Sequence, residues 1–468
     1  MRQVYLAEIK NSWLTWLGVS LTFVAANYGL AVGFLYVATG IKGYAAGVLS
    51  AVNLGQLAAI GGVNILFGAI VAAVVIGSST ALVIAARRGA FARLALAGAT
   101  PGQVVRVVMS QLVVVTLACA VVGDILAAVL FPFYLDAEAA DREMAVPKVG
   151  QALWAYLAAN LLCVGMALIG GWRQARAASR IPPVEALRPV RETPAATRRR
   201  RWILRGLAIA GCLLVIIGSF VVFPGIATVA GPDAGDLAFQ LAVLLLVVTG
   251  LAIAVAGPSA LAGFASAWAS LIPSPGGVWH LARTTLRVRA ERFARSVTPI
   301  MFAVGLMAGM IATIGTLEAS MLAAGRELVL SSAGPFAIFT LVGAPLIVSG
   351  AGAVGGLVMM ARQRDAELAL ASIVGATPRQ RILTSLFEAL LITVTGVIAG
   401  LLMAAVAVVF LAFAVNLLLG VSAVQVPMVF FGSVIAVCLA IAVAATVGPI
   451  IPALRKPAPA VIAKLTAE

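Results

Sequence analysis

Long apolar runs recur along the whole 468-residue chain, and they limit its fold more than any other feature. Each run holds about 20 residues, the length with which a helix crosses roughly 30 Å of hydrocarbon. The runs begin near Leu14, Gly61, Val107, Trp154, Ile203, Leu237, Val297, Phe336, Leu386 and Met428. They do not alternate polar and apolar residues as the strands of a membrane barrel would. The sequence therefore predicts an all-α polytopic membrane protein with about ten transmembrane helices.

Basic residues gather on one side of the predicted membrane. If the N-terminus is cytosolic, 28 of the 32 Lys and Arg residues fall in cytosolic segments, and the four others are Lys42, Arg142, Lys148 and Arg326. The positive-inside rule then predicts a multi-pass protein of the cell (plasma) membrane with both termini in the cytoplasm. This distribution accounts for the net charge of +15 without a nucleic-acid partner.

An internal repeat divides the chain. Residues 98–103, Gly-Ala-Thr-Pro-Gly-Gln, recur as Gly-Ala-Thr-Pro-Arg-Gln at 375–380, and the same shift of 277 carries Gly123 onto Gly400. We expect two four-helix repeats, 1–190 and 277–468, joined by an Arg-rich linker with two connecting transmembrane helices at 191–276. Both copies of the motif must face the same side, so the repeats are expected to be parallel. The helix count between 203 and 272 stays open.

The repeated motif has the chemistry of a helix end followed by a helix start. Gly98 suits the left-handed position that ends a helix. Thr100 can cap the next helix, Pro101 fits its first position, and Gln103 completes a capping box. Gly375, Thr377, Pro378 and Gln380 repeat the pattern. We predict two rigid cytosolic hairpins, each continuing into a membrane helix. The alternative is that the hairpins only connect two spans.

These residues resemble the FtsX-like (MacB-type) ABC transporter permeases. The second repeat matches the family at Arg364, Glu367, Gly375, Ala376, Thr377, Gln380 and Glu388. The first repeat matches at Arg87, Arg88, Gly98, Ala99, Thr100 and Gln103, but has Ala90 and Gln111 in the places of the two acids. The resemblance implies that the hairpins dock on two copies of a cytosolic ABC ATPase subunit, and the missing acids imply unequal docking.

The sequence has no Gly-x-x-x-x-Gly-Lys-Ser/Thr stretch, the phosphate-binding loop of many ATPases. We therefore expect no catalytic residue and no cofactor in this chain, with ATP and Mg bound by the partner ATPase. The lone His280 is expected on an interfacial amphipathic helix running from Trp279 to Arg295, and no metal site is predicted.

A few polar residues within the apolar runs are candidates for a substrate or gating role. Asp124 is an acid well inside a span, which is costly enough to suggest function, and its counterpart in the second repeat is Leu401. Asn27 and Asn64 are further candidates, with helix-helix hydrogen bonding as the alternative. Gly352 and Gly356 are expected to allow close packing of helices.

The predicted outer loops are short, so a substrate taken from the bilayer fits best. We expect a permease that exports or extracts a hydrophobic or amphipathic substrate, such as a lipid, lipopeptide or antimicrobial peptide. The first alternative is a mechanotransmission permease that relays ATP hydrolysis to a partner at the outer surface. A second alternative, an ion-coupled transporter, would be expected to carry several intramembrane acids.

Overall fold

The computed structural model describes residues 13–87, 98–141, 151–179, 195–231, 234–273, 276–288, 290–325, 335–363 and 373–426, together with Phe91, Leu96 and most of 428–444. Every regular element within these ranges is a helix. The elements are α2 (Trp13–Ala45), α3 (Ala51–Ala86), α5 (Pro101–Asp141), α6 (Leu153–Ala178), α7 (Ala195–Ala230), α8 (Ala234–Ala256), α9 (Pro258–Ser270), α10 (Gly277–Val288), α11 (Ala290–Ala323), α12 (Pro335–Gln363) and α14 (Pro378–Leu419).

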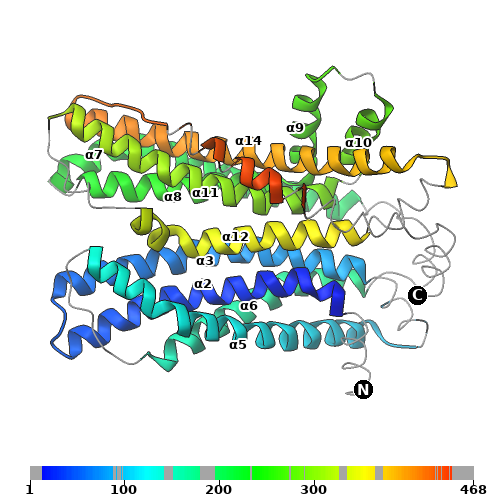
Figure 1. Cartoon of the computed structure of the whole chain (residues 1–468), viewed down its shortest axis with the longest axis horizontal. Coiled ribbons are helices and arrows are strands. Elements are labelled where there is room, and N and C mark those ends of the chain that lie inside the picture. The colour runs from blue at the N-terminus through cyan, green and yellow to red at the C-terminus, as the bar shows by residue number, and fades with distance from the viewer. Residues whose placement is uncertain are drawn as a thin grey trace.

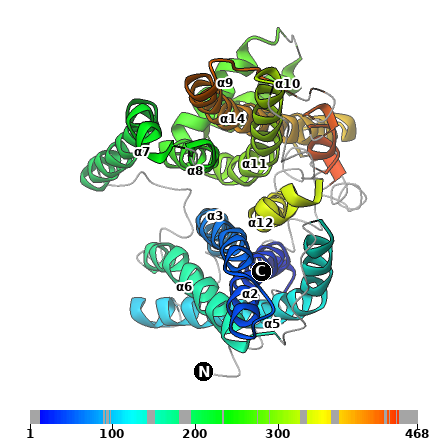
Figure 2. The ribbon, with the colours of Figure 1, turned by 90° about the vertical axis from the view of Figure 1, so that its left-hand side faces the viewer.

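All ten predicted apolar runs contain helix. Among the described residues, eight helices are long and apolar enough to cross a membrane, and shorter apolar stretches lie at Gly343–Gly356 of α12 and at Phe431–Ile441. The long helices run side by side along the molecule (Figure 1). Helix α7 lies at the edge of the bundle (Figure 2), and Leu214, Val221 and Val229 on it are more than 70% exposed. Such an apolar surface is suited to lipid.

The uncertain region after α8 contains a second, shorter helix. Helix α8 ends at Ala256, where Gly257 takes a φ of 91° and Pro258 begins α9. With 13 residues, α9 is about 20 Å long, which is too short to cross the bilayer. The apolar run therefore does not continue as a membrane helix toward Ile272.

The expected amphipathic helix from Trp279 to Arg295 is divided in the structure. Helix α10 ends at Val288 and α11 begins at Ala290. Trp279 is buried and meets Phe387 of α14 edge to face, with ring centroids 5.4 Å apart. Ala282 is also buried in the same apolar cluster. The face of α10 that carries Trp279 and Ala282 thus packs on α9 and α14.

The two repeats build the same helix crossing. A Cβ atom added to Gly123 of α5 would lie 3.0 Å from Val24 O and 3.0 Å from Tyr28 N of α2. A Cβ atom added to Gly400 of α14 would lie 2.9 Å from Met301 O and 2.8 Å from Gly305 N of α11. The shift of 277 relates the glycines and both pairs of backbone atoms. Each long helix therefore touches the first helix of its repeat at equivalent atoms.

Helix α12 joins the two halves of the molecule. It lies between the group of α2, α3, α5 and α6 and the group of α8, α11 and α14 (Figure 2). Gly352 packs closely on Val75 of α3, as predicted, whereas the close backbone approach to Gly18 of α2 is made by Gly355 and not by Gly356. Gly355 and Gly356 differ in this contact because successive residues of a helix point about 100° apart.

Candidate functional site

The two copies of the repeated motif have the predicted geometry. Gly98 and Gly375 have φ values of 88° and 96°, in the left-handed region. The Thr100 backbone N–H donates to Gln103 Oε1 at 2.9 Å, and the Gln103 N–H donates to Thr100 Oγ1 at 3.4 Å. The corresponding distances between Thr377 and Gln380 are 2.9 and 3.3 Å. Both helices therefore begin in a capping box that fixes their first turn.

Each cap starts an unusually long helix. Helix α5 has 41 residues and α14 has 42, so both are about 60 Å long. Each runs without interruption from its cap to the glycine crossing at Gly123 or Gly400. Because a helix transmits axial force, displacement at the cap would reach the crossing with the first helix of the repeat.

The caps are accessible surfaces. Gly98, Thr100, Pro101 and Gln103 are exposed, while Ala99 is half-buried. Gly375, Thr377, Pro378 and Gln380 are likewise exposed, and Ala376 is half-buried. Three predicted docking residues, Arg88, Arg364 and Glu367, lie outside the described residues, as does Ala90.

Arg87 faces the protein interior. It is 6% exposed and donates a hydrogen bond from Nη1 to Gln111 Oε1 of α5 at 2.7 Å. Its guanidinium carbon lies 5.6 Å from the centre of the Trp16 ring and 5.7 Å from that of Phe91. Gln111 is the repeat-one counterpart of Glu388, which is half-buried on α14. The Arg87 contact therefore ties the end of α3 to α5 near the start of the hairpin.

A polar cluster lies inside the membrane-spanning part of the first repeat. Asn27 of α2 donates from Nδ2 to Asp124 Oδ1 at 2.8 Å and to Ala120 O at 2.9 Å. Asn160 of α6 donates from Nδ2 to Asp124 Oδ2 at 2.9 Å. The sequence singled out Asn27 and Asp124 but not Asn160, although an amide in the fourth apolar run was a usable signal. Three helices thus meet at one carboxylate.

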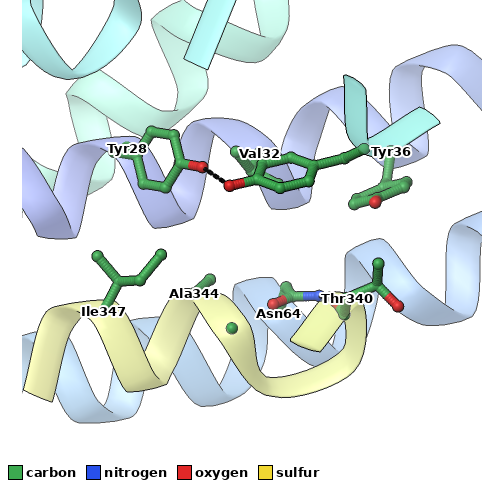
Figure 3. Close-up of a pocket in the computed structure, with 9 residues that line it drawn as sticks. Tyr28, Val32, Tyr36, Asn64, Thr340, Ala344 and Ile347 are labelled. Atoms are coloured by element: carbon green, nitrogen blue, oxygen red, sulfur yellow. Dashed lines mark hydrogen bonds between the residues drawn. The ribbon is translucent and has the colours of Figure 1, made fainter. Parts of the chain in front are cut away.

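Asn64 contributes to a second site, a pocket between the first repeat and α12. Its Nδ2 donates to Thr340 O of α12 at 2.6 Å, one turn before Pro345. The pocket is small, with a cavity volume of about 20 Å³, and is lined by Tyr28, Val32, Tyr36, Asn64, Tyr134, Thr340, Gly343, Ala344 and Ile347. The Tyr28 and Tyr134 hydroxyls are 2.6 Å apart and form a hydrogen bond, which is the dashed line at Tyr28 in Figure 3. The sequence reasoning did not single out these tyrosines.

The described residues contain no group of three or more His, Cys, Asp or Glu side chains that could hold a metal ion. His280 is exposed on α10. Cys119 and Cys163 are buried, and Cys212 and Cys438 are half-buried.

Comparison with protein families identifies the chain. The sequence model of the family described as FtsX-like permease C-terminal matches residues 62–183 and again residues 339–458. These two stretches cover more than half of the 468 residues and begin 277 residues apart, at 62 and 339. The chain belongs to the FtsX-like permease family. A comparison with curated proteins found no match.

Family membership and the apolar helices together define a multi-pass membrane protein with two FtsX-like regions. Permeases of this family are generally non-enzymatic membrane subunits that partner with ABC ATPase subunits. The chain accordingly has a permease-type role in an ABC transporter.

Proposed function

We propose that this chain is the complete membrane unit of an ABC transporter that exports or extracts a hydrophobic or amphipathic molecule. Two copies of a separate cytosolic ATPase, which bind ATP and Mg, would dock on the two capped hairpins. In this proposal residues 1–190 and 277–468 are the two repeats, 191–276 link them, and both termini are cytoplasmic.

The observation that carries the proposal is that each of the two caps is joined to a glycine crossing by one continuous helix. A capped end at Thr100 or Thr377 leads through one continuous helix to the crossing at Gly123 or Gly400. An ATPase that moved both caps together would move α5 against α2 and α14 against α11. Such a paired motion suits the closing of two ATPase subunits.

Two features support an amphipathic cargo. The pocket beside Asn64 has the kind of lining found in sites for small organic ligands, mostly apolar and aromatic with a few polar atoms. Its cavity volume of about 20 Å³ has room for about one water molecule, so a cargo would enter only after the helices around it separate. It also lies between the two halves, where α12 packs on α2 and α3. A relative movement of the halves would therefore change the shape of the pocket.

The second candidate is a mechanotransmission permease, in which the same helices relay hydrolysis to a partner at the outer surface. One feature favours it: α5 and α14 are each about twice as long as the roughly 30 Å hydrocarbon core requires. Both candidates need a coupled hairpin, so they are separated by whether cargo moves.

The test is to interrupt the connection without removing any side chain. Insertion of Gly-Ser-Gly between Leu383 and Thr384 of α14, between the cap at Thr377 and the crossing at Gly400, should leave ATPase binding intact but abolish substrate-stimulated hydrolysis and transport in proteoliposomes. The matched control inserts the same residues after Gly47, an exposed loop glycine with a φ of 70°. If the insertion in α14 leaves coupling unchanged, the hairpins are only connectors.

A further inference from the structure

The Asp124 cluster exists in only one of the two repeats. At the shift of 277, the counterparts of Asn27 and Asp124 are Val304 and Leu401. The counterpart of α6 in the second repeat includes the stretch Phe431–Ile441, which contains no acid or amide. Nevertheless, Gly123 and Gly400 make the same crossing. The fold therefore does not require the polar cluster, and its presence needs another explanation.

The cluster lies within the spanning part of its helices. Asp124 is about 35 Å along α5 from Pro101, and Asn160 is about 10 Å from the Leu153 end of α6. Asp124 is thus past the midpoint of the 41-residue α5, counted from its cap. A carboxylate at such a place is costly and usually marks function.

The hydrogen-bonding capacity of the cluster is only partly used. Among the described residues, Asn27 Oδ1 and Asn160 Oδ1 are buried and have no hydrogen-bond partner, and Asp124 has no ion pair. The O and N atoms of one amide are about 2.3 Å apart, so each unpaired oxygen lies within roughly 5 Å of an Asp124 oxygen. Besides the carboxylate, the cluster thus has two neutral acceptors that no described residue uses.

We propose that Asp124, Asn27 and Asn160 bind the primary ammonium group of an amphipathic ligand. A primary ammonium carries one positive charge and three N–H donors, which match one carboxylate and two amide oxygens. This proposal deepens the proposed function, on which it rests for the idea that the ligand is cargo. It places recognition of the ligand's ammonium group in the first repeat.

The surroundings favour a ligand with an alkyl chain over an inorganic ion. Asp124 is half-buried, so part of this residue lies at the surface of the helix bundle. Val121 and Ile125 next to it are each 58% exposed, and Leu161 beside Asn160 is 76% exposed. An ammonium in the cluster would therefore leave its chain lying on apolar helix surface within the bilayer.

The test measures binding to the full chain alone, without ATPase, in uncharged detergent. Hexadecylamine is titrated and its occupancy followed by native mass spectrometry, with hexadecanol and hexadecyltrimethylammonium as comparison ligands. The wild type should bind the primary amine about tenfold or more tightly than either comparison ligand, since charged hydrogen bonds of ordinary strength give this factor. Asp124→Asn should remove the preference.

Two further variants control for folding and charge. Asp124→Leu copies the second repeat at Leu401, so it should elute and melt like the wild type while losing the preference. Asp136→Asn makes the same charge change at an exposed position on α5 and should retain it. Equal binding of amine and alcohol, equal binding of both cations, or displacement of the amine by millimolar NaCl would each overturn the proposal. Because no ATPase is present, these outcomes are independent of the hairpin test.

Discussion

Gly123 and Gly400, 277 residues apart, each face one backbone oxygen and one backbone nitrogen of the first helix of their repeat, at the equivalent atoms in both cases. A methyl group at either position would lie at or below 3.0 Å from backbone. The backbone cannot rotate away as a side chain can, so the two helices would have to separate. This relationship makes the crossing a place where stability can be tested in both repeats.

The first prediction concerns these crossings. Gly123→Ala and Gly400→Ala should each destabilise the protein by about 1–3 kcal/mol, as overpacking does. The measurement is the unfolding midpoint in detergent. Gly165→Ala on α6 is the matched control, since an added Cβ atom there meets nothing within 4 Å. A loss of stability at Gly165 as large as that at Gly400 would show that close approach is not the cause.

The second prediction concerns the contact between Arg87 and Gln111. Gln111→Leu should lower the free energy of unfolding by about 1.5–3 kcal/mol, the range for a buried hydrogen bond to a charged group. Gln111→Glu, which copies Glu388 of the second repeat, should keep the contact as an ion pair and so retain stability. The measurement is the stability of both variants relative to the wild type, from thermal unfolding. If the two variants are equally unstable, Arg87 does not depend on this partner.

The third prediction concerns unequal coupling of the hairpins. If Glu367 contacts a basic group of the ATPase, Glu367→Ala should cost on the order of 2–5 kcal/mol of complex affinity and reduce substrate-stimulated hydrolysis. Ala90→Ser, at the matching place of repeat one, should change neither quantity. Both are measured at matched expression with the ATPase subunit added. Negligible effects from both would favour hairpins that merely connect spans.

The fourth prediction concerns orientation. Single cysteines placed at Ala46 and Val374, in a background without the four native cysteines, should differ in their labelling in sealed cells. The basic residues put Val374 in the cytosol, so only the cysteine at position 46 should react with an impermeant reagent. Both positions are exposed, so burial cannot explain the difference. The opposite pattern of labelling would reverse the topology and contradict docking of the hairpins on a cytosolic ATPase.

Features that depend on local chemistry could be predicted from the sequence. The caps at Thr100 and Thr377 follow from residues only three positions apart, because the side chains that close a capping box come from the same helical turn. The apolar runs likewise indicated helices, because a bilayer leaves a spanning segment few other ways to satisfy its backbone. The repeat of 277 residues also predicted that Gly123 and Gly400 would be equivalent.

Features that depend on how helices face one another were decided only by the tertiary structure. In the sequence Arg87 is one of several basic residues, and only the tertiary structure brings it to Gln111 of α5 in the protein interior. Asn160 gains its meaning from lying beside Asp124, 36 residues away, on a different helix. The apolar pattern could not specify these rotations, because a helix that is apolar on all sides has no preferred face. Close contacts at glycine and a few polar hydrogen bonds select them.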